Sequence, residues 1–585
     1  MEIGTTANAD ATARRHERVQ QHLTDIGVEP QPLDLHEVKR DYPDVDVRAA
    51  WRINLEEALA VDVLIGPNYP YEHALIGVAP LRAGSGHVYT NNTLCLLKPQ
   101  EAHVLSDNEE VLDELMTRAR ATIAKGTARG AVNPEEVVDY WKGSTSGSRI
   151  LLVGAVSSEP HQFHFARVGH SVAVADAADV VAAWVSNHTN RAAEPERSSF
   201  LVAGLDFNTR ISTPKELYDW FAENRSDQVP LLVAAAEGAR DAIPLIVAIP
   251  GASDGTALLA SWVRKSVKKQ IGRSNKVPGF RSGTAPGHVA APYIYSPHAV
   301  LERARVKRVD AVWLTERGGT GSSAAVRTGR VVLIGCGSLG STIARLLVKS
   351  GVSRLAIIDP QILEWDNIAR HELGGRFVGQ SKAEALASEL RKDFPHIEIE
   401  AMPTTWQRAY EEQPELFRDS VVVSTTADPT SDVQLNDVCQ KIPGVVAVIF
   451  AWLEPFAGAA QALVVAPGGG CLRCACDECG TFKHAVTDWE GVTVRHEPGC
   501  ALNWQPYAEL EAIPAKAFVA DIVLGSLRTS PAVSALHSWV GPERTRKEFG
   551  GTLRPAWTAS HGESADNATY TDLWECACST REAVA

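Results

Sequence analysis

The chain has 585 residues, of which 45% are hydrophobic and 22% are charged, and its formal net charge is −14. At about 150 residues per domain, this length predicts roughly three or four domains. The acidic balance excludes nucleic acid as the main partner, and no apolar run reaches the length of about 18 residues that predicts a membrane span. The first residues lack the apolar segment of a signal peptide. We therefore expect a cytoplasmic protein whose ten cysteines are reduced.

The first predicted domain covers residues 1–145. A helix is expected near its start and another over 108–126. The apolar stretches 62–81 and 86–99 lie between these helices and are typical of strands joined by turns. The small and polar segment 141–149 then predicts a linker to the next domain.

The second predicted domain covers residues 146–325 and is a middle, linking unit of the α/β class. A helical stretch is expected over 176–189, and residues 316–330 are predicted to form a loop that closes the unit. Apolar runs at irregular spacing are predicted to supply its strands, at 149–156, 198–207, 244–251 and 309–318.

The third predicted domain, residues 326–585, opens with an apolar strand that runs into Gly335, Gly337 and Gly340. A helix and a second strand follow, and this second strand ends at Asp359. Glycines at this spacing allow a tight turn and let backbone amides approach phosphate groups at a helix N-terminus, while the aspartate is placed to bind ribose hydroxyls. The pattern predicts a nucleotide site, but it serves both hydride transfer and nucleotidyl transfer.

The next segment favours nucleotidyl transfer over a dehydrogenase. Asn367, Arg370 and Lys382 all lie in the connection that leaves Asp359. Hydride transfer needs no cationic cluster beside the phosphates, whereas nucleotidyl transfer does, because negative charge builds on the α-phosphate and on the departing pyrophosphate. Asp428, at the end of a later strand, is a candidate ligand for a Mg²⁺ ion that bridges the phosphates.

These residues carry a resemblance to a known family. The elements "GCGSLG", "IIDPQILEWDNIARHEL", "GQSKAEA" and "STTAD" resemble those of the ThiF/MoeB/ubiquitin-activating family over roughly 330–585. The resemblance implies a Rossmann-like adenylation domain that binds ATP with Mg²⁺, an acyl-adenylate of a protein's C-terminal glycine as the product, and a homodimer. It assigns the ATP site to Asp359, Asn367, Arg370, Lys382 and Asp428.

A cysteine that receives the acyl group is the next expectation, since a thioester keeps the carbonyl activated for attack by an amine. Cys500 lies in a loop with proline and glycine before an apolar helical run, and activating enzymes with a catalytic cysteine resemble this arrangement. The alternatives for this thiol are a zinc ligand or a packed core residue.

Cys95 is the second candidate thiol. The stretches "GPNYPYEHALIGV" and "GHVYTNNTLCLLKP" resemble a ubiquitin-conjugating α+β domain, in which a cysteine flanked by leucine accepts the acyl group by transthiolation. The family's His-Pro-Asn tripeptide is absent, so the candidates for stabilising the oxyanion are His87, Asn91 and Asn92. Without the resemblance, Cys95 is an apolar-flanked core thiol.

A cysteine cluster predicts structural zinc. "CLRCACDECG" holds Cys471, Cys474, Cys476 and Cys479 as two adjacent Cys-x-x-Cys units. The resembling family combines one such unit with a pair near its C-terminus, which implies that zinc is bound by Cys471, Cys474, Cys576 and Cys578. A redox pair is the alternative.

The resulting functional hypothesis is a single-chain activating and conjugating enzyme. It resembles the fusions of bacterial antiphage operons, where the substrate is a cGAS-like nucleotidyltransferase, and related fusions that act on a small ubiquitin-like modifier; the acceptor is a lysine of a target protein. One rival is a sulfur-carrier adenylyltransferase of the thiamine or molybdopterin type, which leaves Cys95 idle. The other is a non-catalytic scaffold.

Overall fold

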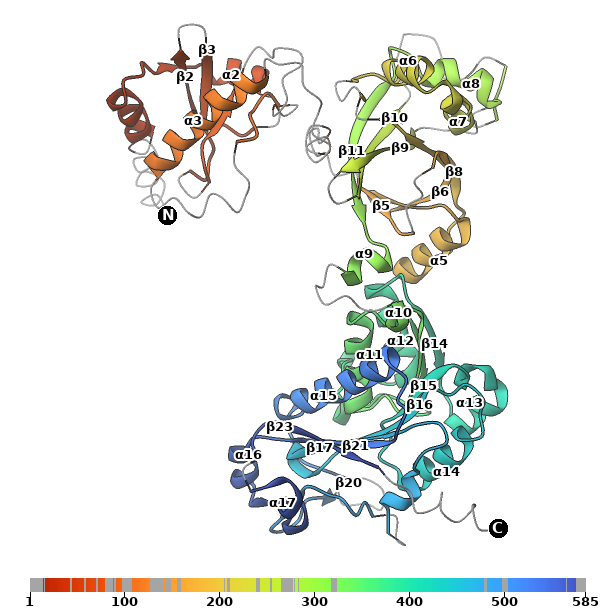
Figure 1. Cartoon of the computed structure of the whole chain (residues 1–585). Coiled ribbons are helices and arrows are strands. Elements are labelled where there is room, and N and C mark those ends of the chain that lie inside the picture. Colours follow the sequence, from red (N-terminus) through yellow and green to blue (C-terminus); the bar gives the residue numbers. More distant parts are fainter. Residues whose placement is uncertain are drawn as a thin grey trace. The chain divides into compact units, whose positions relative to one another are not determined.

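The computed structural model describes most of the chain, in two compact units that we treat separately (Figure 1). One unit consists of residues 1–182 and 194–308, and the other of residues 183–193 and 309–585. The described residues are 14, 16–42, 45–56, 59–69, 72–78, 88, 91–96, 108–126, 138, 141, 149–154, 159–204, 206–207, 211–237, 242–252, 255–264, 277, 279–281, 284–316, 324–477, 481–496, 503–563 and 565–574.

The N-terminal part of the first unit is an antiparallel sheet with helices on both faces (Figure 1). Its strands follow the order β1 (Gln31–Pro32), β2 (Ala49–Glu56), β3 (Leu59–Ile65) and β4 (Leu75–Gly77). Alternate residues of β2 point to opposite faces, so that Trp51 and Ile53 pack with α3 (Asn108–Gly126) and Ala50 packs with α2 (Leu35–Asp41). The helix expected over 108–126 is confirmed.

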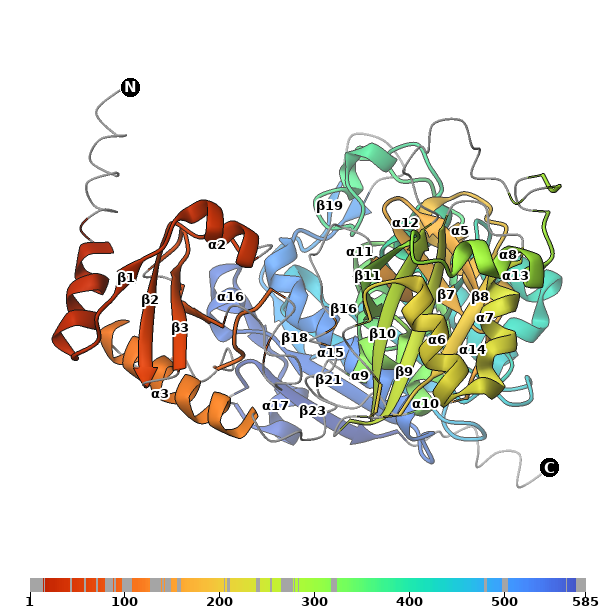
Figure 2. The ribbon, with the colours of Figure 1, turned by 90° about the horizontal axis from the view of Figure 1, so that it is seen from above.

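The rest of the first unit is built around a closed barrel, with strand order β10-β11-β5-β7-β6-β8-β9 within the described residues. The strands are β5 (Arg149–Leu152), β6 (His161–Val168), β7 (Ser171–Ala175), β8 (Glu196–Val202), β9 (Ala242–Ala252), β10 (Gly255–Arg264) and β11 (Val300–Arg308). The helices along this part of the chain are α5 (Ala178–Thr189), which belongs to the second unit from residue 183 onward, α6 (Pro214–Asn224), α7 (Val229–Ala236) and α8 (Gly287–Ile294). Figure 2 shows α6 and α7 lying over β9 and β10, where they cover one outer face of the barrel.

Two expectations for the segment after the barrel are wrong. The apolar run 309–318 is not a strand but contains helix α9 (Ala311–Glu316), because the Asp310 carboxylate accepts the Trp313 N–H at 3.0 Å and so caps the first turn. The predicted loop 316–330 contains a further short helix, α10 (Ala324–Thr328).

The second unit holds a mixed eight-stranded sheet in the order β14-β13-β12-β15-β16-β17-β21-β23. The first five strands are parallel to one another and the last three are antiparallel. Their bounds are β12 (Arg330–Ile334), β13 (Arg354–Ile358), β14 (Glu398–Met402), β15 (Ser420–Ser424), β16 (Ala447–Leu453), β17 (Ala459–Val465), β21 (Ala535–Val540) and β23 (Ala568–Leu573). The order of the parallel strands confirms the α/β class and the predicted Rossmann-like arrangement of this unit.

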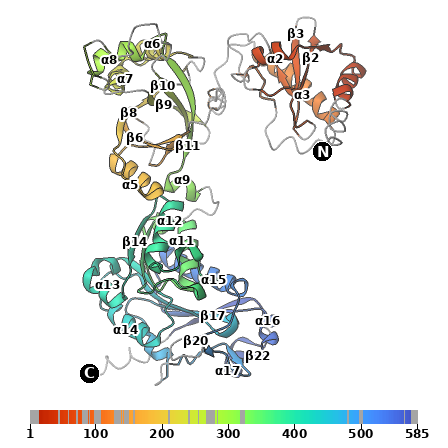
Figure 3. The same cartoon turned by 180° about the vertical axis from the view of Figure 1, so that it is seen from behind.

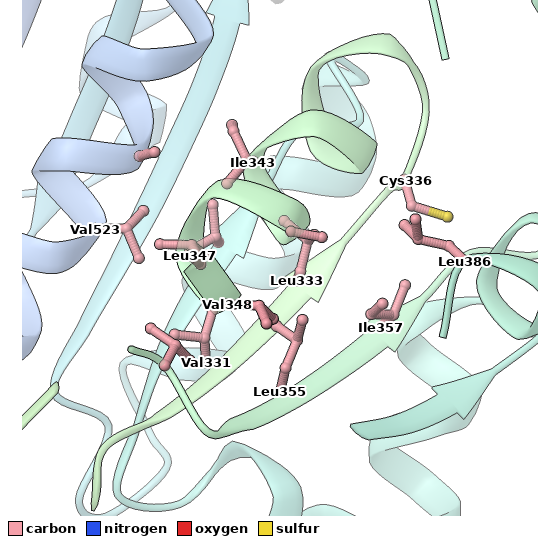
Figure 4. Close-up of a cluster of buried hydrophobic side chains, with 14 of the residues drawn as sticks. Val331, Leu333, Cys336, Ile343, Leu347, Val348, Leu355, Ile357, Leu386 and Val523 are labelled. Atoms are coloured by element: carbon pink, nitrogen blue, oxygen red, sulfur yellow. The ribbon is translucent and has the colours of Figure 1, made fainter. Parts of the chain in front are cut away.

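Helices cover both faces of this sheet. α11 (Ser338–Lys349), α12 (Lys382–Asp393) and α15 (Glu509–Arg528) pack on one face, and α13 (Trp406–Glu412) and α14 (Pro429–Cys439) pack on the other (Figure 3). Figure 4 shows part of the hydrophobic core between the sheet and the helices α11, α12 and α15. Leu333 of β12, Ile343 of α11 and Val523 of α15 all belong to this core. The smaller elements are the strand pair β18 (Thr487–Trp489) and β22 (Gly551–Leu553), the strand pair β19 (Arg495–His496) and β20 (Asn503–Trp504), and helices α16 (Glu543–Glu548) and α17 (Pro555–His561).

Of the helices in the described part of the chain, none has the length and apolar character that crossing a membrane requires. The loops that follow the parallel strands β12, β13 and β15 meet at one edge of the second unit's sheet, because parallel strands end on the same side. The residues that the sequence analysis predicts for nucleotide binding lie in the connections that follow these strands.

Candidate nucleotide site

The glycine loop joins β12 to α11, and each of its glycines has a different surrounding. Gly335 has a φ of +84°, a backbone conformation that favours glycine, and its N–H donates to the Ile358 carbonyl at 2.8 Å. A Cβ on Gly340 would lie 2.1 Å from the Gly335 carbonyl oxygen, so only glycine fits there. Gly337 precedes the first residue of α11, and a Cβ on it would meet nothing within 4 Å. The loop is therefore packed at both ends and open at its centre.

The peptide groups before and after Cys336 are each hydrogen-bonded to a buried side chain. Asp359, which is 4% exposed, accepts the Cys336 N–H at Oδ2 over 2.7 Å. His371 donates from Nε2 to the Cys336 carbonyl at 2.7 Å, while its Nδ1 accepts the Leu373 N–H at 3.0 Å. A ring that accepts at Nδ1 and donates at Nε2 is neutral, and burial accordingly lowers the pKa of His371 to about 4. The Cys336 side chain points into the core beside Leu386 (Figure 4).

Lys382 is connected to the same loop through one intermediate residue. The second carboxylate oxygen of Asp359, Oδ1, accepts the Gln361 N–H at 2.7 Å. The Gln361 side chain in turn accepts a hydrogen bond from Lys382 Nζ at 2.7 Å. Lys382 is only 6% exposed, so its ammonium group is held in place rather than free in solvent. The structure therefore links Asp359 and Lys382 through Gln361.

Asn367 and Arg370 lie in the turn that follows. The Asn367 side-chain oxygen accepts the Glu364 N–H at 3.1 Å. The main-chain carbonyl of Asn367 accepts the N–H groups of Arg370 and His371, each at 3.0 Å. Asn367 thus organises the turn. The Arg370 guanidinium donates to the Gln505 carbonyl at 3.0 Å and lies 4.5 Å from the centre of the Tyr507 ring. It contacts the segment that comes shortly after Cys500 in the sequence.

Asp428 begins α14 at the end of the β15 connection. Its Oδ1 accepts the N–H groups of Thr430 and Ser431, at 3.0 and 3.3 Å, so the side chain caps the helix. The same connection touches the glycine loop, because Thr425 Oγ1 donates to the Gly335 carbonyl at 2.7 Å.

Two charged residues of this region were missed by the sequence reasoning. Asp432 is 7% exposed and accepts hydrogen bonds from Ser424 and Thr426; burial raises its pKa to about 6. The Lys516 side chain is fully buried on α15 and its Nζ reaches Glu509, Thr342 and the Arg370 carbonyl. The available signal was a lone lysine among the small apolar residues Ala512, Ala515, Val519 and Ala520 of the predicted helix.

The two candidate thiols differ in how far the structure describes them. Cys500 lies outside the described residues, but the strands on either side of it, β19 and β20, pair with each other, with Arg495 opposite Trp504. Cys95 is described and partly exposed. It follows Leu94, whose N–H donates to the Ile76 carbonyl at 2.8 Å, and Arg118 of α3 donates to the Leu96 carbonyl at 3.2 Å.

Of the three candidate oxyanion donors near Cys95, His87 lies outside the described residues. The Asn92 amide group donates to the Asp41 carbonyl at 2.6 Å, so its side chain serves the backbone. The Asn91 Oδ1 accepts the Thr93 N–H and hydroxyl, at 3.3 and 2.8 Å. This arrangement directs the Asn91 oxygen toward Thr93 and leaves its amide nitrogen as the candidate donor.

The cysteine cluster is described in part. The Sγ atoms of Cys471 and Cys474 lie 3.4 Å apart, whereas Cys479, Cys576 and Cys578 lie outside the described residues. Among the residues that the structure describes, no group of three or more His, Cys, Asp or Glu side chains is arranged to hold a metal ion.

Comparison with protein families identifies the part of the chain that carries this site. Residues 314–534, a segment that begins within α9 and ends just after α15, match the ThiF family. Among solved structures, the chain is similar to the crystal structure of E. coli MccB with MccA-N7isoASN, at 17% identity and a TM-score of 0.30, over 44% of this chain and 67% of that chain.

The chain is also similar to several curated proteins. The chain is 26% identical over 227 residues to the ATP-dependent ubiquitin transferase-like protein Cap2 of Pseudomonas aeruginosa, covering 37% of this chain and 40% of the relative. It is 33% identical over 149 residues to the adenylyltransferase and sulfurtransferase MOCS3 of Mus musculus, covering 25% of this chain and 31% of the relative. It is 32% identical over 148 residues to the SAMP-activating enzyme E1 of Haloferax volcanii, covering 25% of this chain and 52% of the relative. The chain thus spans about half or less of the length of these relatives.

Proposed function

Since residues 314–534 match the ThiF family, we propose that the chain is an ATP-dependent activating enzyme that joins AMP to the C-terminal carboxylate of a protein. The observation that carries the proposal is the clamped glycine loop: Asp359 and His371 hold the two sides of Cys336 at the start of α11. A helix N-terminus whose amides are fixed in place binds phosphate groups. The names of the Cap2, MOCS3 and SAMP-activating relatives support the same class of reaction.

In the proposed first step, a carboxylate oxygen of the substrate attacks the α-phosphorus of ATP and pyrophosphate leaves. The cations of Lys382 and Arg370 stabilise the negative charge that builds on the phosphates. Asp428 fits a role in holding Mg²⁺, which would neutralise phosphate charge, because within the described residues its helix-capping bonds use Oδ1 and leave Oδ2 for a cation.

The proposed second step moves the acyl group to Cys500. The Cys500 thiolate attacks the acyl carbon of the adenylate, a thioester forms and AMP leaves. Two contacts support this assignment. The strands that flank Cys500 pair with each other, so both ends of its segment are held, and Arg370 binds the Gln505 carbonyl, five residues after this cysteine. The segment that carries the thiol is therefore tied to the nucleotide site.

The proposed last steps use Cys95. Its thiolate attacks the Cys500 thioester and Cys500 leaves as a thiolate; a lysine amine then attacks the Cys95 thioester, Cys95 leaves and an isopeptide bond forms. The partial exposure of Cys95 supports the proposal, and so does an Asn91 amide group four residues before it in the sequence. Having both thiols on one chain raises their effective concentration.

We further propose that Cys471, Cys474, Cys576 and Cys578 bind a structural zinc ion. The two described sulfur atoms, 3.4 Å apart, are near the separation of about 3.8 Å that two tetrahedral thiolates have at Zn–S distances of about 2.3 Å. Trp574 supports the pairing with the C-terminal cysteines, since its indole N–H donates to the Cys471 carbonyl at 3.2 Å only two residues before Cys576. Metal analysis should find one zinc per chain, lost in Cys471→Ser and retained in Cys476→Ser.

The proposed partners are a protein with a C-terminal glycine, of either the cGAS-like nucleotidyltransferase or the ubiquitin-like class, a target lysine, and a second copy of the chain in a homodimer. Antiphage defence in a bacterial cytoplasm is the proposed setting. The likeness to MOCS3 favours a second candidate function, adenylation of a sulfur carrier. In that case Cys95 takes no part in the reaction.

Intact-protein mass spectrometry after incubation with Mg·ATP and the protein encoded by the neighbouring gene tests the relay. Wild type should form a thiol-labile adduct that Cys500→Ala abolishes and that Cys95→Ala confines to Cys500. The control, Cys439→Ala, changes a buried thiol on α14 and should behave as wild type. An adenylate without a thioester at either cysteine contradicts the relay and favours the sulfur-carrier function.

A further inference from the structure

Lys516 is a buried cation with three hydrogen-bonding partners in the second unit. Its Nζ lies 2.6 and 2.7 Å from the two carboxylate oxygens of Glu509, 3.2 Å from Thr342 Oγ1 and 3.3 Å from the Arg370 carbonyl oxygen. The three protons of an ammonium group match these three partners. The side chain is 0% exposed, and burial lowers its pKa.

Neutralising Glu509 does not explain why this lysine is buried. The Glu509 side chain is 35% exposed and is solvated at the start of α15. A surface lysine would serve it equally well, whereas a buried charge carries a desolvation cost of several kcal/mol. The neighbours of Lys516 on the buried face of α15 are alanine and valine, which would pack without that cost. The position is therefore explained by the two other partners, Thr342 and Arg370.

These two partners belong to the nucleotide site. Thr342 lies on α11, and its hydroxyl also lies 3.4 Å from the carbonyl of Ser338, the first residue of that helix after the glycine loop. Arg370 bears the guanidinium that reaches the Gln505 carbonyl and the Tyr507 ring. One ammonium group thus joins the glycine-loop helix, the main chain of Arg370 and the start of the helix that follows the Cys500 segment.

We propose that Lys516 is a positioning residue for the phosphate-binding arginine. It fixes the main chain from which the Arg370 side chain extends, so that the guanidinium meets phosphate oxygens from a backbone that is already in place. Lys516 itself does not contact the nucleotide. This inference rests on the proposed function, since it requires ATP at the glycine loop and the Arg370 guanidinium on its phosphates.

The test compares two ligands, Mg·ATP and adenosine, because only the first carries phosphates. Lys516→Met replaces the ammonium group by an apolar chain of similar length, and Lys349→Met makes the same change at an exposed position near the end of α11. Calorimetry should show Mg·ATP binding to Lys516→Met at least tenfold more weakly than to wild type. Adenosine affinity, measured by competition, should change less than twofold, and the control should match wild type for both.

A second comparison, made in the Arg370→Ala variant, tells whether Lys516 positions the arginine or supports the fold in general. In Arg370→Ala, adding Lys516→Met should weaken Mg·ATP binding by less than a further twofold, because the group that Lys516 positions is already absent. A loss of at least tenfold in this background overturns the proposal. So does equal weakening of Mg·ATP and adenosine by Lys516→Met, since that result means that the lysine only supports the pocket.

Thr342→Val keeps the inference testable if Lys516→Met does not fold. It preserves the side-chain volume and removes one partner of the ammonium group, and it should weaken Mg·ATP binding about threefold with adenosine unchanged. Unchanged binding of both ligands overturns the proposal. If wild type binds no Mg·ATP, both the proposed function and this inference fail; if wild type binds it and the variants bind it equally, only the inference fails.

Discussion

At the scale of single residues, His371 supports the glycine loop in its neutral form. One ring nitrogen is a hydrogen-bond donor and the other an acceptor: Nε2 donates to the Cys336 carbonyl, and Nδ1 accepts the Leu373 N–H. Protonation would place a proton on Nδ1, which would then face the Leu373 N–H. The low pKa of about 4 follows from burial of the ring and makes the loop sensitive to acid.

We expect the second unit to lose stability as the pH falls from about 6.5 toward 4. The unfolded chain binds a proton to His371 at an ordinary pKa of about 6.5, whereas the folded state resists it, so the contribution is complete above 6.5 and declines below it. The loss at pH 5 should be about 2 kcal/mol. Urea midpoints followed by hydrogen exchange of peptides from 330–359 measure it.

His371→Gln is the control for this pH dependence. Asp432 contributes with the opposite sign, because its raised pKa of about 6 favours the folded state as the pH falls, so wild type alone mixes both effects. The difference between wild type and His371→Gln isolates the histidine. A difference that stays constant between pH 7.5 and pH 5 would contradict the prediction.

Gly337 and Gly340 form a matched pair for mutation. Gly340→Ala puts a Cβ 2.1 Å from the Gly335 carbonyl and should lower the stability of the second unit by about 3 kcal/mol. Gly337→Ala meets nothing within 4 Å, so it should leave the melting temperature unchanged and weaken Mg·ATP binding by crowding the phosphates. Thermal unfolding and calorimetry distinguish the two, and equal destabilisation by both variants would argue against this account.

At the scale of elements, Glu454 joins β17 to β18. It is 5% exposed; its Oε1 accepts from Gln461 and from the Val486 N–H, and its Oε2 accepts from the N–H and hydroxyl of Thr487. Four donors directed at two oxygens require the ionised carboxylate. The sequence gives no local sign of this role, since the partners lie up to 33 residues away.

Glu454→Gln should therefore destabilise the second unit by about 2 kcal/mol, because the new amide group turns a donor toward a donor. The effect should concentrate on β18, whose amides should exchange hydrogen faster than those of β12. Glu490→Gln, a change of the same kind at an exposed residue, should have no effect. Uniformly faster exchange across the sheet would show that Glu454 does not act locally.

The sequence predicts elements best where the pattern is local. The strand before the glycine loop, the helix after it and the second strand are confirmed as β12, α11 and β13. The barrel was not foreseen, because its closure pairs β5 with β11, two strands about 150 residues apart, and no short window records such a pairing. Helix α9 was missed for the opposite reason, since a single cap at Asp310 outweighs the apolar run.

The sequence predicts only those residues of the candidate site that follow a recognisable order along the chain. Asp359, Lys382, Asn367 and Arg370 carry charge or hydrogen bonds in a recognisable order along the chain. Lys516 contacts the main-chain carbonyl of Arg370 from 146 residues further along the chain, so its role depends on tertiary packing. Cys500 and the C-terminal cysteines stay predictions, because they lie outside the described residues.

At the scale of the whole molecule, the chain contains two compact units with separate cores. Calorimetric unfolding should therefore show at least two transitions, as multi-domain chains do. Mg·ATP at 100 times its dissociation constant should raise only the transition of the unit that carries the glycine loop, by roughly 5 °C or more. Hydrogen exchange assigns the transitions, NAD is the control ligand, and a shift of both transitions would contradict a nucleotide site confined to one unit.

The interior thiols of the second unit have a practical consequence for labelling chemistry. Cys336 and Cys439 are 0% and 2% exposed, and burial raises the pKa of both, that of Cys439 to about 12. Alkylating reagents attack thiolates, so a brief iodoacetamide pulse should pass over these two side chains in the native protein and modify them as soon as the sheet opens. Alkylation of Cys336 and Cys439, followed by the mass of their peptides, therefore reports how fast the second unit unfolds without any engineered probe.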